Sequence, residues 1–388
     1  MTCSEETIPE HSVTISGRMI PIARPVVTEE DQARVLEVLA SGQLSHGDWV
    51  ERFEAAFAAY VGARFGIATS SGTTALQVVL EAAGIGPGDR VIVPPFTFVA
   101  TSNAVVHRGA VPVFVDIEKD TLNLDPNRVE DALRRHRRVR AILVVHLYGL
   151  PARMDALCDL SRRYGLLLIE DAAQAHGAAF RGRRVGSFGD AAIFSFYPTK
   201  NITTGEGGMI VTSDETLARR ARLLVHAGAQ DGAYEYEVVG YNFRMTNVAA
   251  ALGLSQLGRL DVLNEIRRRN AAYLTAHLRD IPDIRTPVEP PETYHVYNQY
   301  TVRAQERDAL REFLAGRGIE TRVYYPRPVP ATRAYRRVRY EGGAWPETER
   351  ACREVLSLPV HPALGPEDLR GVVEAIQAFA DSRAVVQK

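Results

Sequence analysis

Lysine is so scarce in this 388-residue chain that its few positions point to chemistry that arginine cannot perform. Three of the 46 basic residues are lysines and 43 are arginines, and the lysines are Lys119, Lys200 and Lys388. Arginine stays protonated, whereas a lysine withdrawn from water can lose its proton and attack a carbonyl. Lys200 ends the apolar run 193–199, which suggests amine chemistry. On this observation alone, a surface lysine whose stem covers apolar residues is an equal alternative.

Two acids that follow a predicted strand add a second chemical group. Glu170 and Asp171 precede a mostly small stretch, 172–177, which leaves room for a ligand beside the backbone. A buried carboxylate needs a cationic partner or it takes up a proton. A protonated pyridine nitrogen would be such a partner, and the carboxylate would keep that ring electron-withdrawing. Taken alone, Asp171 fits a helix N-cap better, and an Mg²⁺ site is a further alternative.

A hydroxyl-rich stretch at 70–74 is a candidate anion site. It contains Ser70, Ser71, Gly72, Thr73 and Thr74 and precedes an apolar helical pattern. Backbone N–H groups and hydroxyls would therefore gather at the positive start of a helix, where phosphate binds well. Helix starts of this composition are also common without a ligand. The stretch lacks the lysine-containing pattern of nucleotide-binding loops, and no Gly-x-Gly-x-x-Gly follows the first strand, which disfavours NTP and NAD.

The elements that position these groups are short apolar strands that alternate with helices between about residues 65 and 212. This pattern predicts a parallel sheet with crossover helices, and such sheets bind ligands beyond the carboxyl ends of their strands. Asp171 and Lys200 both follow strands in this way. A helix is predicted at 154–164, with Leu157, Leu160 and Tyr164 on one face and Gly165 as its C-terminal cap. The predicted strands are 91–93, 111–115, 141–145, 166–169, 193–196 and 209–212.

The second half of the chain predicts a smaller α+β domain. Residues 247–279 have a helical pattern throughout, and they are followed by a predicted strand at 298–303 and helices at 307–317 and 366–379. A single core stops growing near about 250 to 300 residues, so two domains are expected. We expect an α/β fold with an N-terminal arm at 1–20, a large domain at 21–255, and a small domain at 256–388 that includes the linking helix.

The composition excludes several classes of protein. A net charge of −1 argues against a nucleic-acid partner, and the arginine-rich stretch 134–140 is interpreted as the solvated end of a helix. The first twenty residues lack the apolar core of a signal peptide, and no later segment has the roughly 18 apolar residues of a membrane helix. We therefore expect a cytoplasmic protein without a membrane partner. Cys3, Cys158 and Cys352 lie far apart, which predicts neither disulfides nor a metal site.

Together these residues resemble the DegT/StrS family of sugar aminotransferases, which are fold-type I enzymes that use pyridoxal 5′-phosphate. The resemblance runs from about Pro21 to the C-terminal helix. Within the family, the chain is similar to the perosamine synthases. It implies a large domain with a mostly parallel sheet and a smaller C-terminal domain. The motifs that carry it are GQLSHG at 42–47, SGT at 71–73, TFVAT at 97–101, HLYG at 146–149, EDAAQ at 170–174, SFYPTKN at 195–201, GEGG at 205–208 and GYNFRM at 240–245.

The resemblance implies a role for each residue that would contact the cofactor ring. Lys200 matches the Schiff-base lysine that also moves protons, and Asp171 matches the partner of the pyridinium nitrogen. Gln174 matches a hydrogen-bond donor to the ring phenolate. Phe98 stands where the family stacks an aromatic side chain on the ring.

The resemblance also implies how the phosphate is held and that two subunits share each site. Gly72, Thr73 and Ser195 match the positions that hold the phosphate. Asn242 matches the residue that reaches the phosphate of the other subunit, which implies a homodimer with shared active sites. His295 and Tyr325 lie in stretches that approach the substrate in the family, so they are our candidate substrate residues.

The implied reaction transfers an amino group, with glutamate as the expected donor, to a nucleotide-linked keto-deoxysugar. Some relatives replace the lysine with histidine and dehydrate the sugar, so Lys200 favours transamination. Other relatives aminate cyclitols such as keto-inositols, or make aminobenzoate-type precursors; the latter carry histidine where this chain has Gln174. A cofactor-binding regulator without enzymatic activity would need a DNA-binding module, and the sequence contains no helix-turn-helix extension.

Two motifs favour amination at C4 of the sugar over C3. Relatives that act at C4 tend to read TGEGG after the lysine and N-Y/F-RMT at the cross-subunit loop, and this chain has both, at 204–208 and 242–246. Relatives that act at C3 more often show GDGG and NSRL. The stretches 297–301 and 324–326 also occur in C3 relatives, so C3 remains the alternative. The choice depends only on how the sugar is rotated over the same lysine.

Overall fold

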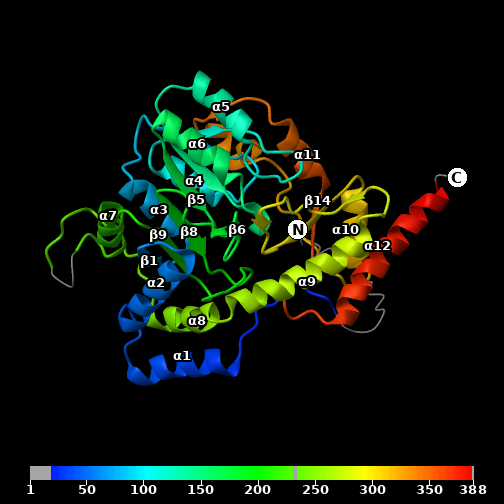
Figure 1. Cartoon of the computed structure of the whole chain (residues 1–388), viewed down its shortest axis with the longest axis horizontal. Coiled ribbons are helices and arrows are strands. Elements are labelled where there is room, and N and C mark those ends of the chain that lie inside the picture. Colours follow the sequence, from blue (N-terminus) through cyan, green and yellow to red (C-terminus); the bar gives the residue numbers. More distant parts are fainter. Residues whose placement is uncertain (1–18, 230–233, 387–388) are drawn as a thin grey trace, which may run out of the picture.

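An eight-stranded sheet forms the centre of the larger part of the molecule (Figure 1). The computed structural model describes residues 19–229 and 234–386, so nearly all of the predicted N-terminal arm and Lys388 lie outside the described residues. The strand order is β1-β9-β8-β5-β4-β2-β3-β13. The strands are β1 (Phe65–Thr69), β2 (Arg90–Val93), β3 (Val111–Phe114), β4 (Val139–Val145), β5 (Leu167–Asp171), β8 (Ala191–Ser195), β9 (Gly208–Thr212) and β13 (Glu341–Gly342).

Both faces of this sheet are apolar because helices cover both of them. Alternate residues of one strand point to opposite faces, so Val91 and Val93 pack with one set of helices and Ile92 with another. The first set is α3 (Gly72–Ala82), α4 (Ala100–His107) and α7 (Glu215–Val225). The opposite face is covered by α2 (Asp48–Val61), α5 (Pro126–Arg135), α6 (Met154–Tyr164) and α8 (Asn247–Leu257), and α1 (Glu29–Ser41) packs on α8.

A smaller domain with its own apolar core lies at the far end of the long helix α9 (Leu260–Leu278) (Figure 1). Its antiparallel sheet has the order β10-β12-β14. Its elements are β10 (Ile284–Arg285), β12 (Tyr300–Ala304), α10 (Arg307–Ala315), α11 (Pro346–Glu354), β14 (Val355–Leu358) and α12 (Pro366–Val386). A third sheet, of β6 (Ala179–Phe180), β7 (Arg183–Arg184) and β11 (Thr293–Tyr294), ties residues 293–294 to the large domain.

The predicted α/β architecture is confirmed, with one correction to the sheet. All six predicted strands exist, but β9 is antiparallel to both of its neighbours, β1 and β8. A loop rather than a helix joins β8 to β9, and an antiparallel neighbour needs no crossover. Apolar runs alone cannot distinguish the two directions. The first strand, β1, was not among the predicted strands.

The predicted helices also need small corrections. Tyr164 is exposed at the end of α6, where Gly165 turns the chain into the left-handed region at φ 64°. The helix predicted at 247–279 breaks after Leu257, and α9 begins at Leu260. The arginine-rich stretch 134–140 is not simply a helix end, because α5 ends at Arg135 and β4 begins at Val139.

No helix within the described ranges is long and apolar enough to cross a membrane.

Candidate active site

The carboxyl ends of three strands meet at one edge of the sheet, and the predicted site residues follow them. Thr69 at the end of β1 and Ser195 at the end of β8 both pair with Gly208 of β9. Asp171 ends β5 and pairs with Ile193 of β8. The helix start at 70–74, the acid and the lysine loop therefore converge. Strand polarity predicted this for Asp171 and Lys200, whereas β1, which precedes the helix start, was not predicted.

Lys200 lies half-buried in the loop between β8 and β9. Its backbone N–H donates to the carbonyl of Tyr197 at 2.9 Å. Burial lowers the pKa of its ammonium group to about 8, although the negative charge of Asp171 acts in the opposite direction. A substantial fraction of the amine is therefore neutral near physiological pH, which an amine nucleophile or base requires.

Asp171 is a buried carboxylate with two side-chain hydrogen bonds, and no arginine among the described residues pairs with it. The Thr101 hydroxyl donates to Oδ2 at 2.8 Å, and the Ala173 backbone N–H donates to Oδ1 at 3.2 Å. The second bond is a local turn contact, and because no helix begins among the described residues between β5 and β6, the N-cap alternative is wrong. Burial raises the pKa of Asp171, while Thr101, Ala173 and the positive charge of Lys200 lower it. A further cation beside it would favour the ionised form.

The other acid of the pair, Glu170, has a structural role that the sequence did not indicate. Glu170 is fully buried and accepts from the backbone N–H groups of Gly186, Phe188 and Gly189, each at 2.8 Å. It also accepts from His146 Nε2 at 2.9 Å. The three backbone bonds fix the loop before β8 against the end of β5, and the bond to His146 joins the end of β4 to β5.

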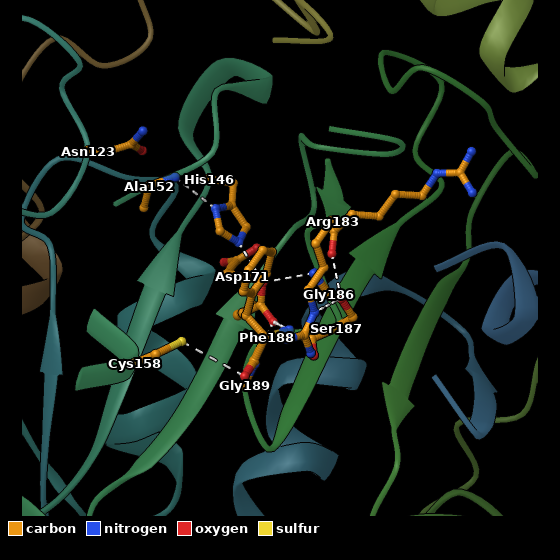
Figure 2. Close-up of polar contacts among 12 residues, drawn as sticks. Asn123, His146, Ala152, Cys158, Asp171, Arg183, Gly186, Ser187, Phe188 and Gly189 are labelled. Atoms are coloured by element: carbon orange, nitrogen blue, oxygen red, sulfur yellow. Dashed lines mark hydrogen bonds and ion pairs between the residues drawn. The ribbon is translucent and has the colours of Figure 1, made fainter. Parts of the chain in front are cut away.

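His146 has a defined orientation in this arrangement. Its Nδ1 accepts from the backbone N–H of Ala152 at 3.0 Å, so the proton that it donates to Glu170 lies on Nε2 (Figure 2). Its backbone N–H donates to the carbonyl of Asp171 at 3.1 Å. His146 and Glu170 both stand in motifs of the family resemblance, which was the signal available for finding them.

Gln174 presents its amide NH₂ group to the site. The backbone N–H of Tyr148 donates to Gln174 Oε1 at 2.7 Å, so the side-chain nitrogen faces the other way. That nitrogen donates to the Tyr325 hydroxyl at 3.2 Å. The negative charge of Asp171 contributes to a raised pKa of the Tyr325 hydroxyl, which burial raises most. The structure therefore brings Tyr325 to the same cluster as Gln174 and Asp171.

The start of α3 forms a cradle against the end of β8. Ser71 caps the helix, accepting from the backbone N–H of Thr74 at 3.1 Å. The N–H groups of Gly72 and Thr73 lie in the first turn, where a helix supplies no acceptor. A Cβ added to Gly72 would lie 2.7 Å from the Cβ of Ser195, so only glycine allows this approach. Backbone N–H groups and the Ser195 side chain thus lie together, as a phosphate requires.

Phe98 lies in the loop before α4 and is 55% exposed. An aromatic ring left this exposed gains apolar burial when a flat ring stacks on it. Asn242 is also exposed, and its backbone forms a bridge with His226.

His295 is placed differently from the other candidates. It is buried, stacks on the ring of Tyr297, and accepts from the Tyr297 backbone N–H at 3.0 Å. Burial lowers the pKa of His295 to about 3, so it is neutral. Its contacts within the chain are those of a supporting residue, and its contact with substrate stays a prediction.

The residues at this edge of the sheet fit pyridoxal 5′-phosphate. Lys200 provides an amine with a lowered pKa, and Asp171 provides a buried carboxylate that can pair with a further cation. The start of α3 can hold a phosphate, and Gln174 provides an oriented amide donor. Within the described residues, no cluster of three or more histidine, cysteine or acidic side chains could hold a metal ion.

A family model described as the DegT/DnrJ/EryC1/StrS aminotransferase family matches residues 25–377 of this chain. The chain belongs to this family. It is therefore an aminotransferase, and its cofactor is pyridoxal 5′-phosphate.

Three curated relatives match nearly the whole chain. A pleiotropic regulatory protein of Geobacillus stearothermophilus is 44% identical, covering 89% of this chain and 93% of the relative. A dTDP-3-amino-3,4,6-trideoxy-α-D-glucose transaminase of Streptomyces venezuelae is 44% identical, covering 91% and 92%. A GDP-perosamine synthase of Caulobacter vibrioides is 40% identical, covering 92% and 97%.

A solved structure shares both the sequence and the fold. The DesV protein of S. venezuelae, determined in complex with a ketimine intermediate, superposes with a TM-score of 0.87 at 44% identity. The match covers 90% of this chain and 94% of DesV. The fold-type I architecture expected from the resemblance is confirmed.

Proposed function

We propose that this enzyme transfers an amino group from glutamate to a nucleotide-linked keto-deoxysugar and that Lys200 is its catalytic amine. The observation that carries the proposal is the half-buried Lys200 near Asp171, with its pKa lowered to about 8. Bound pyridoxal 5′-phosphate supplies an electron-withdrawing ring that stabilises negative charge on the carbon that loses its proton. In this proposal, the Lys200 amine holds and moves that proton.

The surrounding residues hold the cofactor in this proposal. Asp171 pairs with the ring nitrogen and keeps it protonated, and Phe98 stacks on the ring. Gln174 donates its amide N–H to the ring oxygen. The hydrogen bond from Tyr148 to Gln174 Oε1 already orients this amide. The start of α3 and the Ser195 side chain hold the phosphate.

The active unit in this proposal is a homodimer in which Asn242 reaches the phosphate bound by the partner subunit. The exposed side chain of Asn242 supports this arrangement. Within residues 19–229 and 234–386, no hydrogen bond joins Asn242 to Lys200 or Asp171 of its own chain. Tyr325 lines the substrate side of the cofactor in the same proposal, because it contacts Gln174 at 3.2 Å.

We propose amination at C4, on the strength of the TGEGG and NFRMT motifs. Amination at C3 is the second candidate, and a specific observation favours it: the transaminase relative at 44% identity carries a 3-amino sugar in its name. The GDP-perosamine synthase relative at 40% identity supports the nucleotide-sugar substrate in general.

One assay separates these candidates. The enzyme is incubated with glutamate and matched 3-keto and 4-keto nucleotide sugars, and NMR locates the amine on the product. Amination of the 4-keto sugar supports the proposal. Exclusive amination at C3 refutes the regiochemistry and keeps the nucleotide sugar, whereas amination only of a keto-inositol refutes the sugar substrate.

A further inference from the structure

Lys200 sits in a loop without regular structure, so something outside β8 must hold its amine in place. Residues between β8 and β9 make few backbone bonds to the sheet, and within the part of the chain that the structure describes, the backbone N–H of Lys200 bonds to Tyr197 of the same loop. A positional error of about 1 Å at a reacting group can cost about 100-fold in rate. The neighbours of Lys200 show what restrains it.

A single side chain holds the residues on both sides of Lys200. Asn298 donates to the carbonyl of Thr199 at 3.1 Å and to Asn201 Oδ1 at 2.9 Å. Asn201 in turn donates to Asn264 Oδ1 at 2.6 Å and to the carbonyl of Val296 at 3.1 Å.

The chain of amides continues to the segment that follows Asp171. Asn264 lies on α9 and donates to the carbonyl of His176 at 2.8 Å. Each amide donates to the next in one direction, from Asn298 through Asn201 to Asn264. Reversal of Asn201 would turn its carbonyl oxygen toward two other oxygens, so the direction is fixed.

These amides are buried where an unmade hydrogen bond is costly. Asn201, Asn264 and Asn298 are 4%, 0% and 5% exposed. A buried polar group that loses its partner costs about 1 to 3 kcal/mol, so the native arrangement resists local movement. One turn further along α9, the buried Arg267 donates to the carbonyls of Tyr297 and Asn298, each at 3.4 Å, and so holds the segment that carries Asn298.

We propose that Asn201, Asn264 and Asn298 form an amide clamp that positions Lys200 relative to Asp171. The clamp joins the loop that carries Lys200 to α9 and to the segment that follows Asp171. Among the described residues, its hydrogen bonds go to neighbouring residues and not to the side chains of Lys200 or Asp171. Its members are positioning residues. The proposal rests on the proposed role of Lys200 as the catalytic amine.

The same helix offers a matched control. Asn270 is 7% exposed, and its amide donates to the carbonyls of Val360 and His361 at 3.3 and 3.2 Å. Asn298→Ala and Asn270→Ala therefore each remove a buried amide with two donated bonds. Only Asn298 contacts the loop that carries Lys200. A general loss of stability should therefore appear in both variants, whereas displacement of Lys200 should appear only in Asn298→Ala.

The decisive measurement is the reactivity of Lys200 in cofactor-free protein. Competitive labelling with acetic anhydride over a pH series, read by peptide mass spectrometry with exposed Lys119 as the internal reference, gives the pH at which Lys200 is half-reactive. Release of the loop admits water to the amine, so Asn298→Ala should raise this pH by about one unit, which lowers labelling at pH 8 about fivefold. Asn270→Ala should leave it unchanged. In the cofactor-bound enzyme, Asn298→Ala should lower kcat about tenfold with an unchanged KM for the amino donor.

Three outcomes overturn the clamp. If Asn298→Ala and Asn270→Ala give the same half-reactive pH as the unmodified protein, or shift it equally, Asn298 only stabilises the fold. Should Asn298→Ala not fold, Asn298→Ser retains one donor and should give an intermediate shift; no shift in that variant also refutes the clamp. Labelling uses neither cofactor nor substrate, so failure of the clamp is distinct from failure of the proposed reaction.

Discussion

Burial shifts the pKa values of Lys200 and Asp171 in opposite directions within one site. Burial penalises both charges: it lowers the pKa of the lysine to about 8 and raises that of the acid. Their mutual attraction only partly offsets this. In our proposal, the site takes a ligand that pairs with Asp171 and reacts with the neutral amine of Lys200, as a protonated pyridine aldehyde would.

Replacement of Asp171 should separate binding from catalysis. Asp171→Asn keeps the size of the side chain and removes the charge that would hold the ring nitrogen protonated. We expect cofactor binding to persist and the transamination rate to fall about 100-fold or more. Absorbance of the bound cofactor and steady-state kinetics measure the two effects, and a rate equal to that of the unmodified enzyme would make Asp171 structural.

The lowered pKa of Lys200 should appear in the stability of the cofactor-free protein. Between pH 8 and 10.5 the unfolded chain binds a proton that the folded chain does not, so stability rises with pH through this window. Lys200→Met removes this titration. The variant should be more stable than the unmodified protein by up to about 3 kcal/mol at pH 7, and the difference should vanish toward pH 10.5. Denaturant unfolding at several pH values measures it, and a pH-independent difference would refute the shift.

At the scale of elements, the site depends on a close approach between α3 and β8. Gly72 is the contact point, because an added Cβ would lie 2.7 Å from Ser195. The strand register brings the start of α3 close to the end of β8, because Thr69 of β1 and Ser195 of β8 both pair with Gly208.

Gly72→Ala should therefore weaken cofactor binding without unfolding the protein. The added methyl group pushes the helix start away from Ser195, and we expect about a tenfold loss of affinity for pyridoxal 5′-phosphate. Gly86→Ala is the control, because an added Cβ there meets no atom within 4 Å. Equilibrium titration of cofactor-free protein compares the two variants; equal affinities would show that the helix start does not hold the phosphate.

The sequence predicted strand positions and strand ends better than strand direction and buried polar contacts. Parallel neighbours and the site at their carboxyl ends followed from apolar runs and strand polarity. The antiparallel β9 did not, because an apolar run carries no direction. Asn264 and Arg267 have the composition of a solvated helix face, yet the structure buries both. Thr101, which donates to Asp171, was visible only as part of a motif.

At the scale of the whole molecule, the described residues form a large domain around the eight-stranded sheet and a smaller domain with its own core. The smaller core packs around β10, β12 and β14, apart from the large sheet. We retain domain boundaries near residues 20 and 255 as proposals, together with the assignment of the linking helix to the small domain.

Complementation between inactive variants tests the shared site. Lys200→Ala and Asn242→Ala should each be inactive or strongly impaired alone. In a mixed dimer, one of the two sites receives an intact Lys200 from one subunit and an intact Asn242 from its partner, so mixing should restore up to about a quarter of the activity, given random exchange and one intact site in each mixed dimer. Subunit exchange is verified with differently tagged variants, and exchange without recovery would show that each site is complete within one chain.

The central claim, that Lys200 is the residue that binds the cofactor covalently, has a direct test because the chain has only three lysines. Borohydride reduction of the cofactor-bound protein fixes the linkage, and peptide mapping by mass spectrometry then locates the pyridoxyl group. The account predicts one pyridoxyl group per chain, on Lys200, and none in Lys200→Ala. A pyridoxyl group on Lys119 or Lys388, or on no lysine at all, would contradict it.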